Sequence, residues 1–169
     1  MLILPDGSIY TGPDDKPTNF GGYGGILVDK ETGQILRRFY EPVHTNDPQK
    51  AELHGLYASI QLANELYKQN TQTQITILCD CKNAVKYVNN KYAIPRKYSK
   101  IYQYIREELT VNNNAHATIK WIPGHTNNPW NEEADGLAKL ATQLHKNSPV
   151  KRSLDGTPVR NFRPSLVQE

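Results

Sequence analysis

The hydrophobic pattern of this chain changes its period near Pro48, and this change restricts the fold class more than any other feature. Before it, short apolar runs at residues 1–4, 24–29 and 35–40 predict strands, the last two joined by a turn at residues 30–33. After it, helical patterns alternate with strand-like ones. This order predicts an α/β fold in which a mixed β-sheet, antiparallel in its first part, is flanked by helices.

The longest helical pattern begins at Pro48, a residue that suits the first turn of a helix. Its apolar positions form one stripe that should face the sheet, namely Leu53, Leu56, Ile60, Ala63 and Tyr67. Strands are expected at residues 74–79 and 117–122, and further helices at residues 82–88, 99–109 and about 131–144. The polar segment from Thr11 to Phe20 is expected to be a mobile loop.

One domain accounts for nearly the whole chain. A length of 169 residues is typical of one compact unit, which we expect at residues 1–146. Periodicity ends after Lys146, and the tail at residues 147–169 carries three prolines among scattered basic residues. This composition predicts an extended or disordered tail, or a linker from a longer polyprotein.

Composition excludes several classes of protein. No run approaches the ~20 apolar residues of a membrane span, and the apolar opening at Met1–Leu4 is too short for a signal peptide. Cys79 and Cys81 have no second pair to complete a zinc site, so we expect reduced thiols and an intracellular protein, cytoplasmic or nuclear. A net charge of +3 permits a polyanionic partner without pointing to one.

Four acidic residues are candidates for chemistry, and each also has an ordinary structural explanation. Asp6 follows the first short strand, where an Asp often forms a turn. Asp80 ends a strand at the carboxyl edge of the sheet, where α/β proteins bind ligands, but it could also cap the next helix. Glu52, in the first turn of the long helix, could compensate the helix dipole, and Asp135 could be a surface acid of the last helix.

The four acids converge if the strands that carry Asp6 and Asp80 are neighbours and both helices cross near their ends. Carboxylates packed this closely without a cation would raise one another's pKa and cost stability. Two Mg²⁺ ions about 4 Å apart require such a nest of oxygen ligands. We therefore predict a site for two Mg²⁺ ions, with Mn²⁺ as an alternative, held by Asp6, Glu52, Asp80 and Asp135.

A histidine near the last predicted helix is a candidate for proton transfer. His125 follows Pro123 and Gly124 in a loop before the helix that carries Asp135. An imidazole titrates near neutral pH, so His125 could relay protons as product leaves. The other histidines, for which we expect surface or packing roles, are His44, His54, His116 and His145.

The segment at residues 124–138, GHTNNPWNEEADGLA, resembles the C-terminal signature of ribonuclease H. Three further segments match that family in order and approximate spacing: DGS at residues 6–8 followed by GGYG at 21–24, QKAELH at 49–54, and CDC at 79–81. The resemblance covers residues 1–146 and is to type 1 ribonuclease H domains, either free-standing or attached to reverse transcriptases.

This resemblance implies a ribonuclease H-like fold with a five-stranded mixed sheet. It implies an endonuclease that hydrolyses the RNA strand of RNA-DNA hybrids with two Mg²⁺ ions, giving 5′-phosphate and 3′-hydroxyl ends. By matching position, the metal-binding and catalytic acids are Asp6, Glu52, Asp80 and Asp135, and the catalytic histidine is His125. The substrate contacts implied are Gly7, Ser8, Gln49, Lys50 and Asn131.

Three features depart from the family pattern. Pro5 precedes Asp6 and predicts an early end to the first strand. Pro48 stands where many relatives have an asparagine, which leaves Gln49 as the retained polar contact. The segment at residues 89–99 is too short for the extra basic helix of some relatives. It leaves a modest basic strip of Lys91, Arg96, Lys97 and Lys100, which could equally be a solvated face.

Two alternatives to the hydrolase stay open. One is a noncatalytic hybrid-binding module of the same fold, part of a reverse transcriptase or a retroelement polyprotein. The other is a nuclease or strand-transfer enzyme of the wider fold superfamily that acts on DNA. The four acids argue against the first, and the long signature at residues 124–138 argues against the second.

Overall fold

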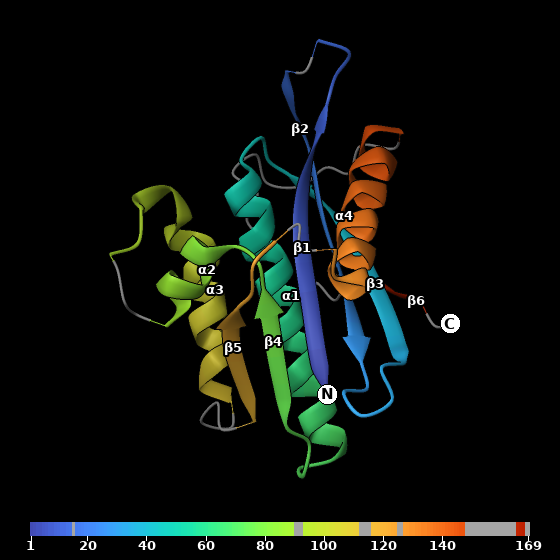
Figure 1. The fold of residues 1–169 in the computed structure, drawn as a ribbon. Helices are drawn as coiled ribbons and strands as arrows, with labels where there is room; N and C mark the ends of the chain where they lie inside the picture. The colour runs from blue at the N-terminus through green and yellow to red at the C-terminus, as the bar shows by residue number, and fades with distance from the viewer. Residues whose placement is uncertain (15, 90–92, 112–115, 125–126, 148–164, 168–169) are drawn as a thin grey trace.

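The computed structural model describes residues 1–14, 16–89, 93–111, 116–124, 127–147 and 165–167. Its strands are β1 (Leu2–Thr11), β2 (Pro17–Val28), β3 (Ile35–His44), β4 (Ile75–Cys79), β5 (Ala117–Trp121) and β6 (Ser165–Val167) (Figure 1). Its helices are α1 (Pro48–Gln69), α2 (Lys82–Val88), the 3₁₀ turn η1 (Arg96–Tyr98), α3 (Ser99–Thr110) and α4 (Pro129–Asn147).

The strands form one mixed sheet in the order β5-β4-β1-β2-β3-β6. The pairs β1–β2, β2–β3 and β3–β6 are antiparallel, whereas β1–β4 and β4–β5 are parallel. The predicted five-stranded mixed sheet is thereby confirmed, with short β6 added at its edge. The strands that carry Asp6 and end before Asp80 are neighbours, as the convergence of the acids requires.

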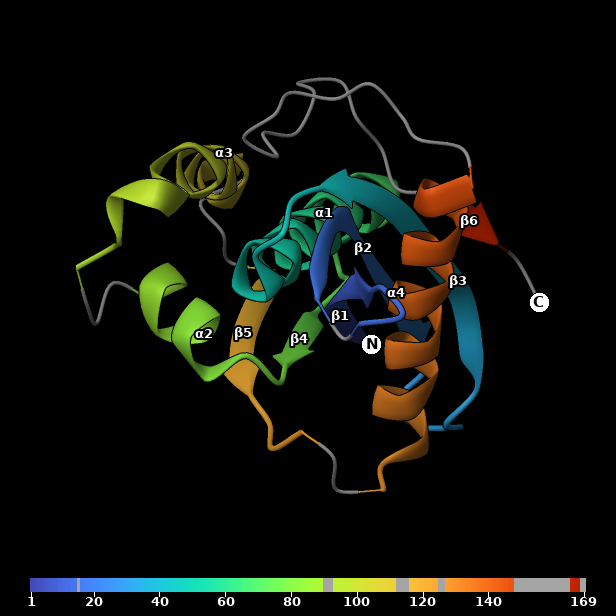
Figure 2. The same ribbon diagram turned by 90° about the horizontal axis from the view of Figure 1, so that it is seen from above.

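Helices cover both faces of the sheet, as Figures 1 and 2 show. Side chains alternate along β1, so Ile3 faces the larger core with α1, α2 and α3, and Leu2 and Leu4 face a smaller core with Leu137 of α4. This alternation means that consecutive residues at the end of β1 reach opposite helices. Asp6 lies on the α4 side of the strand, and Gly7 on the α1 side.

Glycines in β2 allow α4 to pack directly on the strand. A Cβ added to Gly24 would lie 2.5 Å from the Leu137 Cβ, and one added to Gly22 would lie 2.7 Å from the Ala141 Cβ. Any larger residue at these positions would push α4 away from the sheet. The glycine run therefore fixes the distance between the sheet and the helix that carries Asp135.

β1 does not end before Asp6, and the prediction of an early end at Pro5 was wrong. The Thr76 N–H donates to the Met1 carbonyl (3.0 Å), so odd-numbered residues of β1 direct their backbone groups toward β4. That ladder pairs only Leu2 and Ile3, and it has ended before Pro5, which has no N–H to donate. The ladder with β2 uses the other edge of β1 and continues past Asp6.

The expected mobile loop from Thr11 to Phe20 is also shorter than predicted. β1 extends to Thr11 and β2 begins at Pro17, so the two strands form a long hairpin. Polar residues hold its far end: the Thr18 hydroxyl donates to the Tyr10 carbonyl (2.8 Å). The sequence pattern missed these strand residues because they pair at the edge of the domain and lack an apolar run.

The predicted domain boundary falls at the end of α4. That helix ends at Asn147, one residue beyond the predicted limit of 146. Of the predicted tail, residues 148–164 and 168–169 lie outside the described part of the chain, and Ser165–Val167 pair with Arg38–Tyr40 of β3. Among the described helices, none is both long and apolar enough to cross a membrane.

Candidate active site

Close packing of β1 on α1 brings Glu52 beside Asp6. A Cβ added to Gly7 would lie 2.4 Å from the Glu52 backbone nitrogen, closer than real side chains approach. Glu52 is the fifth residue of α1, and the first turn of the helix holds no acid, so the predicted first-turn position was wrong. Asp47 instead caps the helix, and its Oδ1 accepts hydrogen bonds from Gln49 N (2.9 Å) and Lys50 N (3.4 Å).

Asp80 follows the last residue of β4 and does not cap the next helix. The N-cap of α2 is Cys81, which makes no side-chain capping bond. The Asp80 carboxylate instead accepts a bond from Asn131 Nδ2 (3.4 Å) of α4. A Cβ added to Gly124 would lie 3.1 Å from Asp80 Oδ2, so the loop after β5 also approaches this carboxylate.

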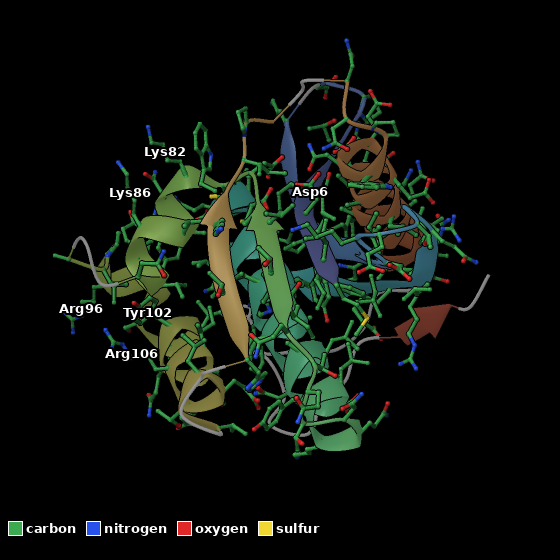
Figure 3. All side chains as sticks on the ribbon, turned by 60° about the horizontal axis from the view of Figure 1, so that its bottom comes forward. Asp6, Lys82, Lys86, Arg96, Tyr102 and Arg106 are labelled. Carbon is green, nitrogen blue, oxygen red and sulfur yellow. The ribbon has the colours of Figure 1, made fainter. Side chains whose placement is uncertain are left out.

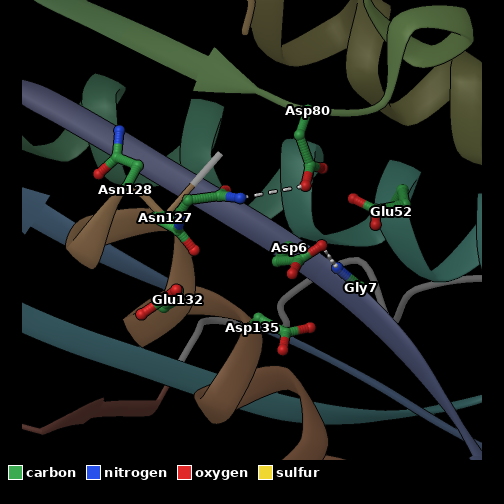
Figure 4. A pocket seen from close by; sticks show the side chains of 9 residues that line it. Asp6, Gly7, Glu52, Asp80, Asn127, Asn128, Glu132 and Asp135 are labelled. Carbon is green, nitrogen blue, oxygen red and sulfur yellow. Dashed lines mark hydrogen bonds between the residues drawn. The ribbon is translucent and has the colours of Figure 1, made fainter. Parts of the chain in front are cut away.

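Three carboxylates meet where the ladder between β1 and β4 has ended. One oxygen each of Asp6, Glu52 and Asp80 lie within 4.8 Å of one another (Figure 4). These residues line a cavity of about 270 Å³, and Asp135 lines it from α4. Three of the four acids therefore converge as predicted, and the fourth, Asp135, lies in the wall of the same cavity.

Two acids of this cluster, Asp6 and Glu52, have raised pKa values because they are buried close to other carboxylates. The pKa of Asp6 is raised to about 7, mainly by burial and also by the charges of Asp80 and Asp135, although hydrogen bonds from Glu52 and the Gly7 N–H oppose the shift. Burial, with the Asp6 charge next in effect, raises the pKa of Glu52 well above its usual range. Without a cation, the cluster thus holds protons near neutral pH.

Asp135 has a cationic partner of its own. Lys139 lies one turn later on α4, and its Nζ is 2.9 Å from Asp135 Oδ2. A hydrogen bond to Asp135 raises the pKa of Lys139, so the lysine stays charged. Both side chains are partly exposed, which makes this a weak surface pair that a ligand in the cavity can displace.

The residues predicted to contact substrate differ in where they lie. Gly7 and Asn131 line the cavity. Gln49 lies one turn before Glu52 on α1 and contacts Tyr98, whereas Ser8 pairs with Gly22 within the hairpin. Lys50 is half-buried in the first turn of α1. His125 lies outside the described residues.

The sequence patterns did not single out three other residues that line the cavity. Asn127, Asn128 and Glu132 all belong to the signature that resembles ribonuclease H, and Figure 4 shows them with the four acids around the cavity. Asn128 Oδ1 accepts from Trp130 N (3.0 Å), and Asn127 has a positive φ of 57°. Glu132 is three residues before Asp135, and this helical spacing could have identified it.

The predicted basic strip is present in part. Arg96 and Lys97 lie on η1, and Lys100 is the second residue of α3, whereas Lys91 lies outside the described residues. Lys97 Nζ is 3.5 Å from Asp47 Oδ2. Figure 3 shows four basic side chains on this side of the molecule, away from Asp6; they are Lys82, Lys86, Arg96 and Arg106.

Comparison with known proteins identifies the family. The sequence model of RNase H matches residues 1–143. The chain belongs to the RNase H family. A comparison with curated protein sequences found no match.

Solved structures of RNase H domains share this fold. The N-terminal RNase H domain of a Mycobacterium tuberculosis protein is 21% identical with a TM-score of 0.68, covering 88% of this chain and 97% of that domain. RNase H1 of Halobacterium salinarum is 20% identical with a TM-score of 0.65, over 84% of this chain and 96% of that one. A foamy viral protease-reverse transcriptase in complex with RNA/DNA hybrid is 18% identical with a TM-score of 0.67, over 85% of this chain and 20% of that one.

Proposed function

We propose that this RNase H family member is an endonuclease that hydrolyses the RNA strand of RNA-DNA hybrids. The observation that carries the proposal is the meeting of the Asp6, Glu52 and Asp80 carboxylates within 4.8 Å at the edge of a cavity that Asp135 also lines. A neutral ligand would not need so many acids in one place. A substrate polyanion enters such a site only together with cations.

The donor set fits two divalent cations. Every candidate ligand is a carboxylate oxygen, which suits Mg²⁺ and also Mn²⁺. Glu52 Oε2 is buried and has no hydrogen-bond partner, so it has an unused lone pair in the cavity. Burial and the neighbouring carboxylates raise the pKa of Asp6, so a bound cation would favour its charged form.

In this proposal, Asp6, Glu52, Asp80 and Asp135 hold the metal ions. When bound, such ions activate a water as nucleophile and stabilise the leaving oxygen of an in-line phosphodiester hydrolysis, giving 5′-phosphate and 3′-hydroxyl ends. Asn131 orients the Asp80 carboxylate through its amide. His125, one residue after Gly124, would accept or deliver protons as product leaves.

The choice of the RNA strand follows from its chemistry. The 2′-hydroxyls of RNA lie in the wide minor groove of the hybrid and distinguish it from DNA. Gln49 and Lys50, at the start of α1, are proposed to contact the substrate, with Gly7, Ser8 and Asn131 beside them. The foamy viral relative of this fold was solved in complex with RNA/DNA hybrid, which supports this class of substrate.

The proposed catalytic unit is residues 1–146. The RNase H match spans residues 1–143 and so includes all four acids and the signature segment. The structural match covers 96% of the solved Halobacterium salinarum RNase H1 chain but only 20% of the foamy viral protease-reverse transcriptase. We propose an intracellular role because hybrids arise where RNA and DNA are synthesised, and a larger reverse transcriptase or polyprotein is a candidate context.

The test is cleavage of a labelled RNA-DNA hybrid by the purified chain. With Mg²⁺ we expect RNA fragments with 5′-phosphate and 3′-hydroxyl ends, no cleavage with a chelator, and no comparable cleavage of duplex RNA or duplex DNA. Hybrid binding without cleavage in Mg²⁺ or Mn²⁺ would instead favour a noncatalytic module. Cleavage of duplex DNA in place of the hybrid would favour a DNA nuclease.

A further inference from the structure

A buried tyrosine outside the cavity links η1 to the first turn of α1. Tyr98 is only 1% exposed, and its hydroxyl lies 2.7 Å from Asp47 Oδ2 and 2.8 Å from Gln49 Oε1. Asp47 is also the N-cap of α1, and the Nζ of Lys97 approaches its carboxylate (3.5 Å). One hydroxyl thus contacts both the cap of α1 and a side chain in its first turn.

The Gln49 side chain lies between this tyrosine and the acidic cluster. Gln49 and Glu52 are three residues apart on α1, so they share one face of the helix. On its other side the Gln49 amide approaches Cys81: burial raises the pKa of this thiol, and a hydrogen bond from the Gln49 side chain opposes that shift. Cys81 directly follows Asp80, which places Gln49 beside the cluster.

The contact with Tyr98 determines which end of the amide is held. The single hydroxyl proton of Tyr98 lies between two acceptors, Asp47 Oδ2 (2.7 Å) and Gln49 Oε1 (2.8 Å), so the amide oxygen of Gln49 faces Tyr98 and its NH₂ group faces Cys81. An NH₂ group has two hydrogens, so one stays available for a ligand beside the bond to Cys81. In the minor groove, A·T and T·A pairs both present acceptor atoms at the same positions, so a donor there binds without distinguishing them. A G·C pair adds the donor amino group of guanine, so a fixed NH₂ donor meets the same pattern at A·T and T·A pairs and a different one at G·C.

We propose that Tyr98 is a positioning residue that orients Gln49 for hydrogen bonding in the minor groove of the RNA-DNA hybrid. This inference rests on the proposed function and on the predicted role of Gln49 in substrate binding. Tyr98 itself is buried and acts only through Gln49. Its contribution is to substrate affinity, because neither residue lines the cavity of the four acids.

The experiment is a double-mutant cycle of Tyr98→Phe and Gln49→Ala, measured as KM and kcat for hybrid cleavage. The dissociation constant for the hybrid is also measured in Ca²⁺, so that binding is followed without turnover. Tyr98→Phe removes one net hydrogen bond, which corresponds to roughly a 2- to 10-fold rise in KM and in the dissociation constant. We expect kcat to change less than about twofold. In the Gln49→Ala background, Tyr98→Phe should have almost no further effect.

Tyr102→Phe is the matched control. Tyr102 is also a buried tyrosine, 3% exposed, and its hydroxyl donates to the Tyr87 carbonyl, away from the start of α1. It should leave KM unchanged, and thermal unfolding of all variants shows that each is folded in the assay.

Three results would overturn the inference. The first is an unchanged KM in Tyr98→Phe, and the second is an equal rise in KM with and without Gln49, which would show a general structural effect. The third is a fall in kcat with KM unchanged. If the wild-type protein neither binds nor cleaves the hybrid, the proposed function fails instead.

Discussion

Helix α1 carries two clusters of buried polar side chains, one near each end, and they are built in opposite ways. Near its start, Glu52 meets Asp6 and Asp80, so that all three side chains are carboxylates and none is a cation. Near its end, the Asn64 amide donates to the Glu108 carbonyl (3.0 Å) and to Glu108 Oε2 (2.8 Å). The Asn64 Oδ1 contacts His116 Nε2 at 2.7 Å.

The difference separates polar groups that hold the fold from polar groups that are arranged for a ligand. In the Asn64 cluster, donors meet acceptors from α1, α3 and the residue before β5, and the Tyr67 ring stacks on His116 with 4.2 Å between centroids. Such pairing stabilises the fold. The carboxylates near the start of α1 repel one another, and this repulsion lowers the stability of the native structure. A bound cation would remove the repulsion.

The largest effect is expected from Asp80→Asn. Loss of one metal ligand removes several kcal/mol of transition-state stabilisation, so cleavage of the hybrid should fall by ~10³-fold or more. Thermal unfolding of the metal-free variant should occur at the same temperature as the wild type or higher, because one repelling charge is gone.

Asp29→Asn is the control for this change. Asp29 is a partly buried acid in the turn between β2 and β3, far along the chain from the cavity, where its Oδ1 accepts from Glu31 N (2.9 Å). This variant should retain full activity. Substantial Mg²⁺-dependent cleavage by Asp80→Asn would show that Asp80 is not a metal ligand.

The opposite pattern is expected at the other end of α1. Asn64→Leu leaves His116 and Glu108 without their buried partner, so the free energy of unfolding should fall by about 1–3 kcal/mol. Hybrid cleavage per folded molecule should not change. Chemical denaturation and a cleavage assay on the same samples measure both quantities, and a loss of cleavage with unchanged stability would reverse the assignment of the two clusters.

The acidic cluster also predicts a pH dependence of stability. The pKa of Asp6 is about 7 in the folded protein and near 3.8 when unfolded, so the folded state binds more protons between these values. The metal-free protein should therefore gain stability as pH falls through 7, by about 1.4 kcal/mol between pH 8 and pH 6.

Mg²⁺ should remove this gain because it competes with the proton, and Asp6→Asn should reduce it because only Glu52 then remains as a buried acid with a raised pKa. Urea denaturation at the two pH values, with chelator and with Mg²⁺, provides the measurement. Equal stability at both values in chelator would contradict the account of Asp6.

The smallest effect is expected from Lys139→Gln. The Lys139–Asp135 pair is partly exposed and worth less than about 1 kcal/mol, so stability should hardly change. Freed from the lysine, Asp135 should bind cations slightly better, and the Mg²⁺ concentration for half-maximal cleavage should fall about two- to threefold. An increase in that concentration would mean that Lys139 assists the site directly.

Much of the fold could be predicted from hydrophobic spacing. The apolar stripe from Leu53 to Ala63 is buried as expected, and the strand at residues 74–79 and the helix at residues 82–88 were predicted within one residue. The four segments that resemble ribonuclease H, at residues 6–8, 49–54, 79–81 and 124–138, located the four acids in the sequence. Their adjacency followed only once β1 and β4 were seen as neighbours.

The features that the sequence did not predict depend on contacts between elements that are distant in the chain. Whether Pro5 ends a strand depends on which edge of β1 has a partner at that residue, and the proline alone does not show this. The hairpin beyond Thr11 has no apolar alternation to mark it. The role of Gly7 is to let α1 approach β1, and a glycine before a serine gives no sign of that contact.

Crystals of the protein soaked in Mn²⁺ would show through the anomalous scattering of the ion whether the carboxylates bind metal. We expect anomalous density in the cavity, bonded to oxygens of Asp6, Glu52 and Asp80, and its loss in Asp80→Asn crystals. Well-ordered carboxylates in the same positions at saturating Mn²⁺, with no density between them, would contradict metal binding by this cluster.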